Sequence, residues 1–129
     1  MIVLDTHAWI WLAADAKRIP AAARHAIDAT DRVGVCAISL WEVAMLVAKG
    51  RLEFDRDTRT WLQQALALPR VELLPLTPEL AVESAGLPAT FPGDPADRLI
   101  VAAARLERAV LVTRDARIRG AEGVKTVWG

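Results

Sequence analysis

Apolar runs and helix-like segments alternate along the whole chain. The runs at residues 2–4, 33–38, 71–76, 110–113 and 124–127 are rich in branched apolar side chains, and the first has no polar residue within it. Such runs are typical of strands buried on both faces of a parallel sheet. Helical patterns fill the intervals at residues 6–14, 21–29, 40–49, 58–68, 78–85 and 96–108. The pattern predicts an α/β fold in which helices cover both faces of a parallel sheet of four to five strands.

Capping residues support the predicted helix starts. Ser39 is expected to cap the helix at 40–49, and Glu42 three residues later completes a capping box. Asp94 precedes Pro95 and is expected to cap the helix at 96–108, since proline suits the first helical position. The helix at 40–49 is apolar on nearly every side, which predicts that it is buried or docked against a partner.

Composition narrows the class of protein. The chain has 129 residues, 53% of them hydrophobic and 25% charged, which suits one packed domain over residues 1–129. Formal net charge is zero, so a strongly basic nucleic-acid footprint is absent, although residues 98–125 carry seven basic side chains against three acids. One cysteine, Cys36, excludes an internal disulfide. No apolar run approaches the length of a membrane span, so we expect a soluble cytoplasmic protein.

Four acids map to one edge of the predicted sheet. Asp5 and Asp115 follow strands, and Glu42 lies in the helix after the strand at 33–38. Asp97 reaches the same edge because the loop at residues 86–93 is long enough to bring the chain back. The four acids are therefore Asp5, Glu42, Asp97 and Asp115. In open α/β sheets, ligands bind outside the carboxyl ends of the strands. Four carboxylates in one crevice repel one another unless a cation lies between them, and Mg²⁺ takes oxygen ligands. Jointly, the acids predict a divalent metal site.

Each acid also has a structural explanation. Asp5 can cap the helix that follows it, and Glu42 can reach back to Ser39 in the capping box. Asp97 lies in a first helical turn, where the helix dipole favours acids, and Asp94 competes with it for any active role. Asp115 alone is typical of a turn. Zinc is disfavoured because one cysteine and two distant histidines make no ligand set.

Basic and aromatic residues near these acids allow two interpretations. Arg98 shares a helical face with Arg105 and Arg108, which is either a solvated face or a contact for a nucleic-acid backbone. The five tryptophans could stack bases, but those in apolar helices are better explained as core or interface residues. His7 could touch a phosphate, although a packed or capping histidine is the better explanation.

Four short motifs carry a resemblance to a known family. They are LDTHA at residues 4–8, SLWE at 39–42, GDPADRLI at 93–100 and TRD at 113–115. In this order and spacing the chain resembles the PIN-domain nucleases, and among them the VapC toxins of bacterial toxin–antitoxin pairs. The resemblance covers essentially the whole chain. It departs from the family at Gly93 and Ala96, where relatives often have a basic and an aromatic residue.

The resemblance implies a three-layer α/β/α fold and a Mg²⁺- or Mn²⁺-dependent ribonuclease. Asp5, Glu42, Asp97 and Asp115 take the places of the family's catalytic acids. Asp5 and Asp97 are the expected metal ligands, with Glu42 and Asp115 completing the site and Asp94 a possible further ligand. Thr6, Ser39 and Thr113 are expected to support these ligands, and Arg98 and Arg114 to contact RNA.

The resemblance also implies partners. They are an RNA substrate, a VapB-type antitoxin whose tail occupies the acidic crevice, and a second copy of the chain in a homodimer. Two alternatives stay open: another PIN-type nuclease role, in RNA processing or flap cleavage, and a non-catalytic binding module that uses the acids as caps. The sequence names neither the RNA nor the antitoxin.

Overall fold

A parallel sheet of five strands forms the centre of the computed structural model, which describes residues 1–129. The strands are β1 (Ile2–Leu4), β2 (Val33–Cys36), β3 (Val71–Leu74), β4 (Val110–Val112) and β5 (Thr126–Val127). Their order across the sheet is β3-β2-β1-β4-β5, with every neighbouring pair parallel. The predicted parallel α/β sheet is therefore confirmed.

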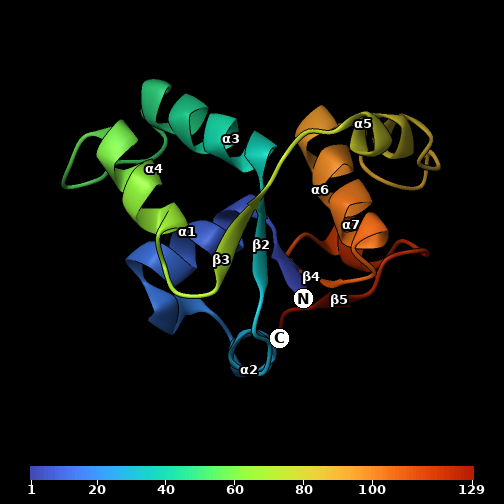
Figure 1. Ribbon diagram of the computed structural model, residues 1–129, viewed down its shortest axis with the longest axis horizontal. Coiled ribbons are helices and arrows are strands. Elements are labelled where there is room, and N and C mark those ends of the chain that lie inside the picture. The colour runs from blue at the N-terminus through green and yellow to red at the C-terminus, as the bar shows by residue number, and fades with distance from the viewer.

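Helices cover both faces of this sheet (Figure 1). They are α1 (Thr6–Ala14), α2 (Ala21–Asp28), α3 (Ala37–Ala48), α4 (Thr58–Leu66), α5 (Pro78–Ala85), α6 (Pro95–Leu106) and α7 (Ala116–Arg119), with a short 3₁₀ helix, η1, at Ala16–Arg18. Helices α1 to α4 contribute to the hydrophobic core on one face, and α5 to α7 to the core on the other. Alternate residues of β1 supply both cores: Ile2 and Leu4 face the first, and Val3 faces the second.

Strand register brings the chemistry to one edge. Leu4 at the end of β1 is paired with Val35 on one side and Val112 on the other. The chain therefore leaves neighbouring strands at the same level, and the backbone N–H of Asp5 still donates to the carbonyl of Val112 at 2.9 Å. The residues that follow these strands meet at the carboxyl edge, as expected for an open parallel sheet.

The predicted boundary between strand 33–38 and helix 40–49 is wrong. Strand β2 ends at Cys36 and α3 begins at Ala37, with Cys36 at the N-cap position and no side-chain cap. The pairing with β3 ends at Cys36, so the apolar residues beyond it have no strand to join and enter the helix. Ser39 is therefore inside the first turn of α3, and the predicted capping box does not form.

Other boundaries move by a few residues. The predicted strand 71–76 ends at Leu74, and the predicted strand 124–127 is reduced to Thr126–Val127. The predicted helix 58–68 ends at Leu66. Helix α3 is docked on one side only: Val43 is fully buried, whereas Trp41 is 59% exposed. No helix has the length and apolar character that crossing a membrane requires.

Candidate active site

Asp5 is the most tightly held of the four acids. It follows β1, occupies the N-cap position of α1 and is only 5% exposed. Its Oδ1 accepts the backbone N–H of Thr6 at 2.8 Å, and its Oδ2 accepts the hydroxyl of Thr113 at 2.6 Å. The predicted capping role and a role in a site are thus compatible, because each carboxylate oxygen retains a further lone pair.

Three hydroxyl and carboxyl groups form a chain beside Asp5. The Thr6 hydroxyl donates to Oε1 of Glu42 at 2.5 Å and lies 2.8 Å from the hydroxyl of Ser39. Thr6 has one hydroxyl proton, so once this is donated to Glu42, Ser39 must be the donor to Thr6. Ser39 is fully buried. Its role is to orient Thr6, and through it Glu42, rather than to cap α3.

The start of α6 separates the roles of two aspartates. Asp94 is the N-cap: its Oδ1 accepts the backbone N–H groups of Ala96 and Asp97 at 2.8 and 3.2 Å. Asp97 lies three residues further on, and its carboxylate accepts no backbone N–H group of the helix. The expected assignment of Asp94 as the cap is confirmed.

Asp115 is the N-cap of α7, where its Oδ1 accepts the backbone N–H of Arg117 at 2.9 Å. The guanidinium of Arg117 also bonds to Asp115, which holds the pKa of that carboxyl below its usual range. The same guanidinium lies 3.6 Å from Oδ2 of Asp97. Arg117 therefore bridges two acids of the site. Arg117 is not among the predicted site residues, although its position two residues after Asp115 was a signal.

One open crevice joins all four acids. It has a volume of about 420 Å³ and is lined by Asp5, Thr6, His7, Ile10, Glu42, Leu46, Asp97, Arg114 and Asp115. Burial and the neighbouring carboxylates, Asp5 foremost, raise the pKa of Asp97 to about 7. Burial also raises the pKa of Glu42, against the opposing effect of its bond from Thr6. The crevice thus holds more negative charge than its own cations balance.

This donor set fits a hard divalent cation. Carboxylate oxygens predominate, and both burial and the neighbouring carboxylates raise the pKa of Asp97, which is the pattern expected where a cation would offset the crowded charge. The crevice is not a closed cage, because no three acidic, histidine or cysteine side chains converge to hold a metal together. Mg²⁺ does not need one, since it is often bound by one or two carboxylates and keeps several water ligands.

His7 and Arg114 close one side of the crevice. The Nε2 atom of His7 accepts the backbone N–H of Arg114 at 3.2 Å, so the ring is neutral with its proton on Nδ1. Burial lowers the pKa of His7, in keeping with this state. The ring packs edge-on against Trp11 and Trp128. The expected packed histidine is confirmed.

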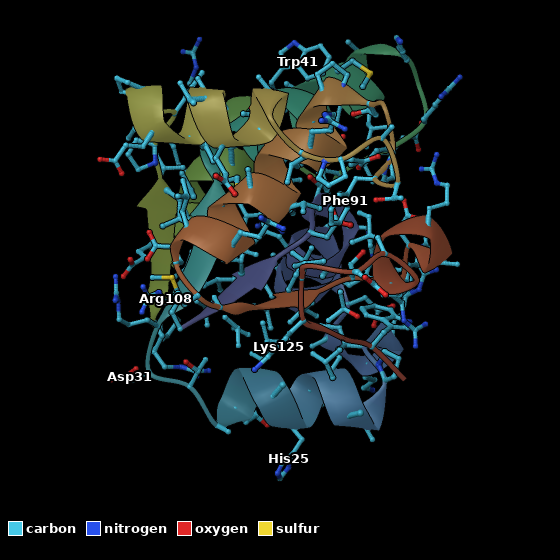
Figure 2. The ribbon with its side chains drawn as sticks, turned by 90° about the vertical axis from the view of Figure 1, so that its right-hand side faces the viewer. His25, Asp31, Trp41, Phe91, Arg108 and Lys125 are labelled. Atoms are coloured by element: carbon cyan, nitrogen blue, oxygen red, sulfur yellow. The ribbon has the colours of Figure 1, made fainter.

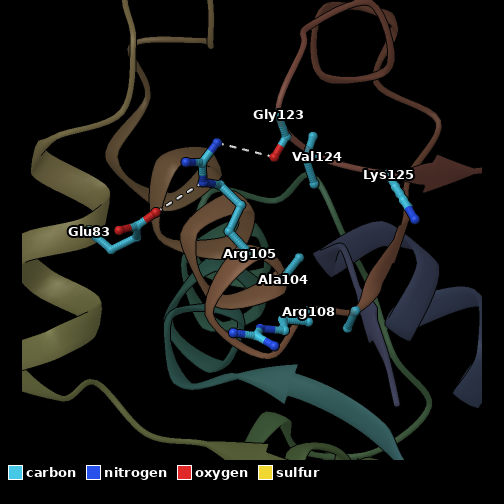
Figure 3. A pocket seen from close by; sticks show the side chains of 8 residues that line it. Glu83, Ala104, Arg105, Arg108, Gly123, Val124 and Lys125 are labelled. Atoms are coloured by element: carbon cyan, nitrogen blue, oxygen red, sulfur yellow. Dashed lines mark hydrogen bonds and ion pairs between the residues drawn. The ribbon is translucent and has the colours of Figure 1, made fainter.

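Arg98, predicted to contact RNA, lies away from this crevice. Its guanidinium donates to the backbone carbonyls of Leu87 and Pro88 and anchors the loop before α6. Arg105 on the same helix bonds to Glu83 and to the carbonyl of Gly123 in a different cavity (Figure 3). That cavity, about 450 Å³, contains none of the four acids. The shared face of α6 joins structural elements, and an RNA contact by Arg98 stays a prediction.

The architecture and the acidic edge together define a class of protein. A family model described as the PIN domain matches residues 2–124, nearly the whole chain. The chain belongs to the PIN-domain family.

The chain is similar to a curated ribonuclease and to solved toxin–antitoxin complexes. The chain is 39% identical over 129 residues to Ribonuclease VapC22 of Mycobacterium tuberculosis, and the match covers 98% of each chain. A crystal structure of VapBC2 from Rickettsia felis bound to a DNA fragment of its promoter matches with a TM-score of 0.70 at 19% identity, over 100% of both chains. A toxin–antitoxin complex from Klebsiella pneumoniae gives 0.67 at 23% identity, over 96% of this chain and 95% of the other. These two structures support the fold.

Proposed function

We propose that this protein is a Mg²⁺- or Mn²⁺-dependent endoribonuclease, formed by one nuclease domain, and the toxin of a VapBC-type toxin–antitoxin pair. One observation carries the proposal: four acids from distant segments line a single crevice at the carboxyl edge of the sheet. The similarity to Ribonuclease VapC22 supports RNA as the substrate. An RNA-cutting toxin meets its substrate in the cytoplasm, which is the proposed location.

The proposed reaction is hydrolysis of a phosphodiester bond. A divalent ion in the crevice supplies a lowered water pKa and charge neutralisation at the phosphate. Asp5 and Asp97 are the proposed ligands, while Glu42 and Asp115 complete the site or orient the attacking water. Asp97 must lose its proton before it binds a cation, because its pKa lies near 7.

The supporting residues hold these carboxylates in place. Thr113 and the backbone of Thr6 fix both oxygens of Asp5, so its free lone pairs have a defined direction. Ser39 and Thr6 leave Oε2 of Glu42 free while they hold Oε1. Side chains fixed in this way orient ligands without reorganisation during the reaction.

A homodimer is the proposed assembly, formed through the exposed side of α3. Trp41 is 59% exposed and lies at the outer edge of the molecule, at the opposite end from α2 (Figure 2). Beside it is an apolar cavity of about 170 Å³, lined by Cys36, Ala37, Ile38, Trp41, Leu76, Leu80 and Leu99. In a two-fold dimer, a protrusion on each copy can enter the cavity on the other copy. This surface is therefore assigned to a second copy, and the acidic crevice to the antitoxin.

The proposal is tested by cleavage of a mixed pool of structured RNAs. Each protein is tested once with Mn²⁺ and once with EDTA. The proteins are wild type, Asp5→Asn and, as a matched control, Asp28→Asn, whose position on α2 is exposed. We expect cutting only with metal, lost in Asp5→Asn and kept in Asp28→Asn. A thermal shift with Mn²⁺ in wild type but not in Asp5→Asn reports metal binding separately. Undiminished cutting by Asp5→Asn contradicts the site, and absence of both cutting and metal binding favours a non-catalytic module.

A further inference from the structure

Three aromatic rings form a cluster beside the acidic crevice. His7 and Trp11 lie one turn apart on α1, with ring centroids 5.9 Å apart. Trp128, which follows β5, lies 5.4 Å from His7 and 5.5 Å from Trp11. All three side chains are half-buried, so the cluster has an inner side against the core and an outer side that solvent reaches.

Two arginines lie over the ring of Trp11. The Cζ atom of Arg18, at the end of η1, is 4.1 Å from the ring centroid, and that of Arg114 is 4.9 Å from it. Neither guanidinium has a hydrogen bond or an ion pair with another side chain, unlike Arg117 or Arg105. A guanidinium that lies parallel over an indole keeps its N–H donors in its own plane, where they remain available to an anion.

This cluster continues directly from the crevice. His7 and Arg114 line the crevice as well as the cluster. The position of Arg114 is fixed because its backbone N–H bonds to His7 and because it follows Thr113, which bonds to Asp5. Arg114 therefore has a defined position relative to the acids, and Arg18 is connected to them through Trp11 and His7.

The negative charge of the crevice affects how an RNA strand can bind beside it. The carboxylates of the crevice repel every phosphate of a bound strand that no cation compensates. The phosphates that flank the scissile one therefore need a positive partner at the border of the crevice. Arg114 lines the crevice, Arg18 lies over the neighbouring Trp11, and neither guanidinium forms an ion pair with a carboxylate.

We propose that Arg18 and Arg114, held over Trp11, bind the backbone phosphate of the RNA nucleotide next to the scissile bond. This proposal rests on the proposed ribonuclease function and names the residues that position its substrate. Arg18 is a positioning residue, because it touches the strand outside the reacting atoms. The aromatic cluster then serves as a rigid base for two phosphate contacts, not only as part of the core.

The test compares Arg18→Gln with Arg59→Gln, which removes the same charge from an exposed position on α4 that has no side-chain bond. A fluorescent single-stranded RNA of mixed sequence and about ten nucleotides is titrated in EDTA, and anisotropy is followed over a range of salt. Cleavage of the structured RNA pool with Mn²⁺ gives kcat and KM. Arg18→Lys keeps the charge but loses the planar stack.

We expect Arg18→Gln to weaken RNA binding and raise KM by about tenfold, the usual effect of one charge-assisted bond. The slope of the logarithm of the binding constant against the logarithm of the salt concentration should decrease by about one. The value of kcat should stay within about twofold of wild type. Arg18→Lys should recover part of the loss, and Arg59→Gln should match wild type. Equal binding and KM in Arg18→Gln and wild type overturn this proposal while the ribonuclease function stands. A wild type that neither binds nor cuts RNA overturns both.

Discussion

The hydroxyl of Thr113 donates a 2.6 Å hydrogen bond to Oδ2 of Asp5, between two residues that are 108 positions apart in the chain. Both follow strands, β4 and β1, which are parallel neighbours in the centre of the sheet. Both side chains are buried, and the backbone of Thr6 holds the other oxygen of Asp5. The carboxylate that we place at the centre of the site is thus fixed by the sheet itself.

Thr113→Val should impair the site without unfolding the protein. The change keeps the shape but removes the hydroxyl, so the buried Oδ2 of Asp5 loses a donor at a cost of about 1–3 kcal/mol in unfolding free energy. Loss of an orienting bond to a metal ligand typically lowers metal affinity or activity by about 10–100-fold. Mn²⁺ titration and RNA cleavage measure both effects. Thr113→Ser, which keeps the hydroxyl, should restore metal affinity and cleavage. If the valine variant is as active as wild type, Thr113 has no role in the site.

Asp97 should make the metal-free protein less stable as pH rises. Its pKa is about 7 in the folded protein, and an unfolded aspartate titrates near 4. Between about pH 4 and about pH 7 the folded state retains a proton that the unfolded state has lost, so stability falls across this range. In EDTA, Asp97→Asn should therefore exceed wild type in Tm by more at about pH 8 than at about pH 5. Asp28→Asn is the control, and a Tm difference independent of pH contradicts the assignment.

Asp94 should act as a helix cap and not as a metal ligand. Its Oδ1 already accepts two backbone N–H groups at the start of α6. Asp94→Ala should reduce the unfolding free energy by about 1 kcal/mol, measured by denaturant titration, and Asp94→Ser should recover most of it. Asp94→Ser should also lower the cleavage rate by no more than about tenfold relative to wild type, as expected for a residue that does not itself bind the metal. A serine variant that is stable but inactive would instead identify Asp94 as a ligand.

Trp41→Asp should convert a dimer to a folded monomer. Trp41 is 59% exposed in the isolated chain, so its replacement leaves the core intact, but a charge in an apolar interface is costly. Light scattering after gel filtration measures the mass, and circular dichroism checks the fold. Val82→Asp is the matched control, since Val82 is 75% exposed and lies outside the cavity beside Trp41. A wild type that is already monomeric rejects this interface.

The correct predictions rest on local signals. The apolar runs predicted every strand of the sheet, and the capping residue Asp94 predicted the start of α6. The wrong boundary arose where two local signals competed. Residues 37 and 38 are apolar and continue the run of β2, and Ser39 with Glu42 has the form of a capping box. Strand pairing decides that β2 stops at Cys36, and the packing of α3 beside α1 brings Ser39 to Thr6.

The sequence by itself determined the class of fold, the sheet edge that carries the acids, and the choice of those acids. It could do so because strand periodicity and the direction of parallel strands place Asp5 and Asp115 without knowledge of any contact. The tertiary structure alone decided which side chains meet. Arg117 bridges Asp97 and Asp115, Arg98 turns to a loop, and Arg18 comes to lie over Trp11. Such contacts depend on how helices pack across the sheet, and this packing follows from the whole core rather than from any one segment.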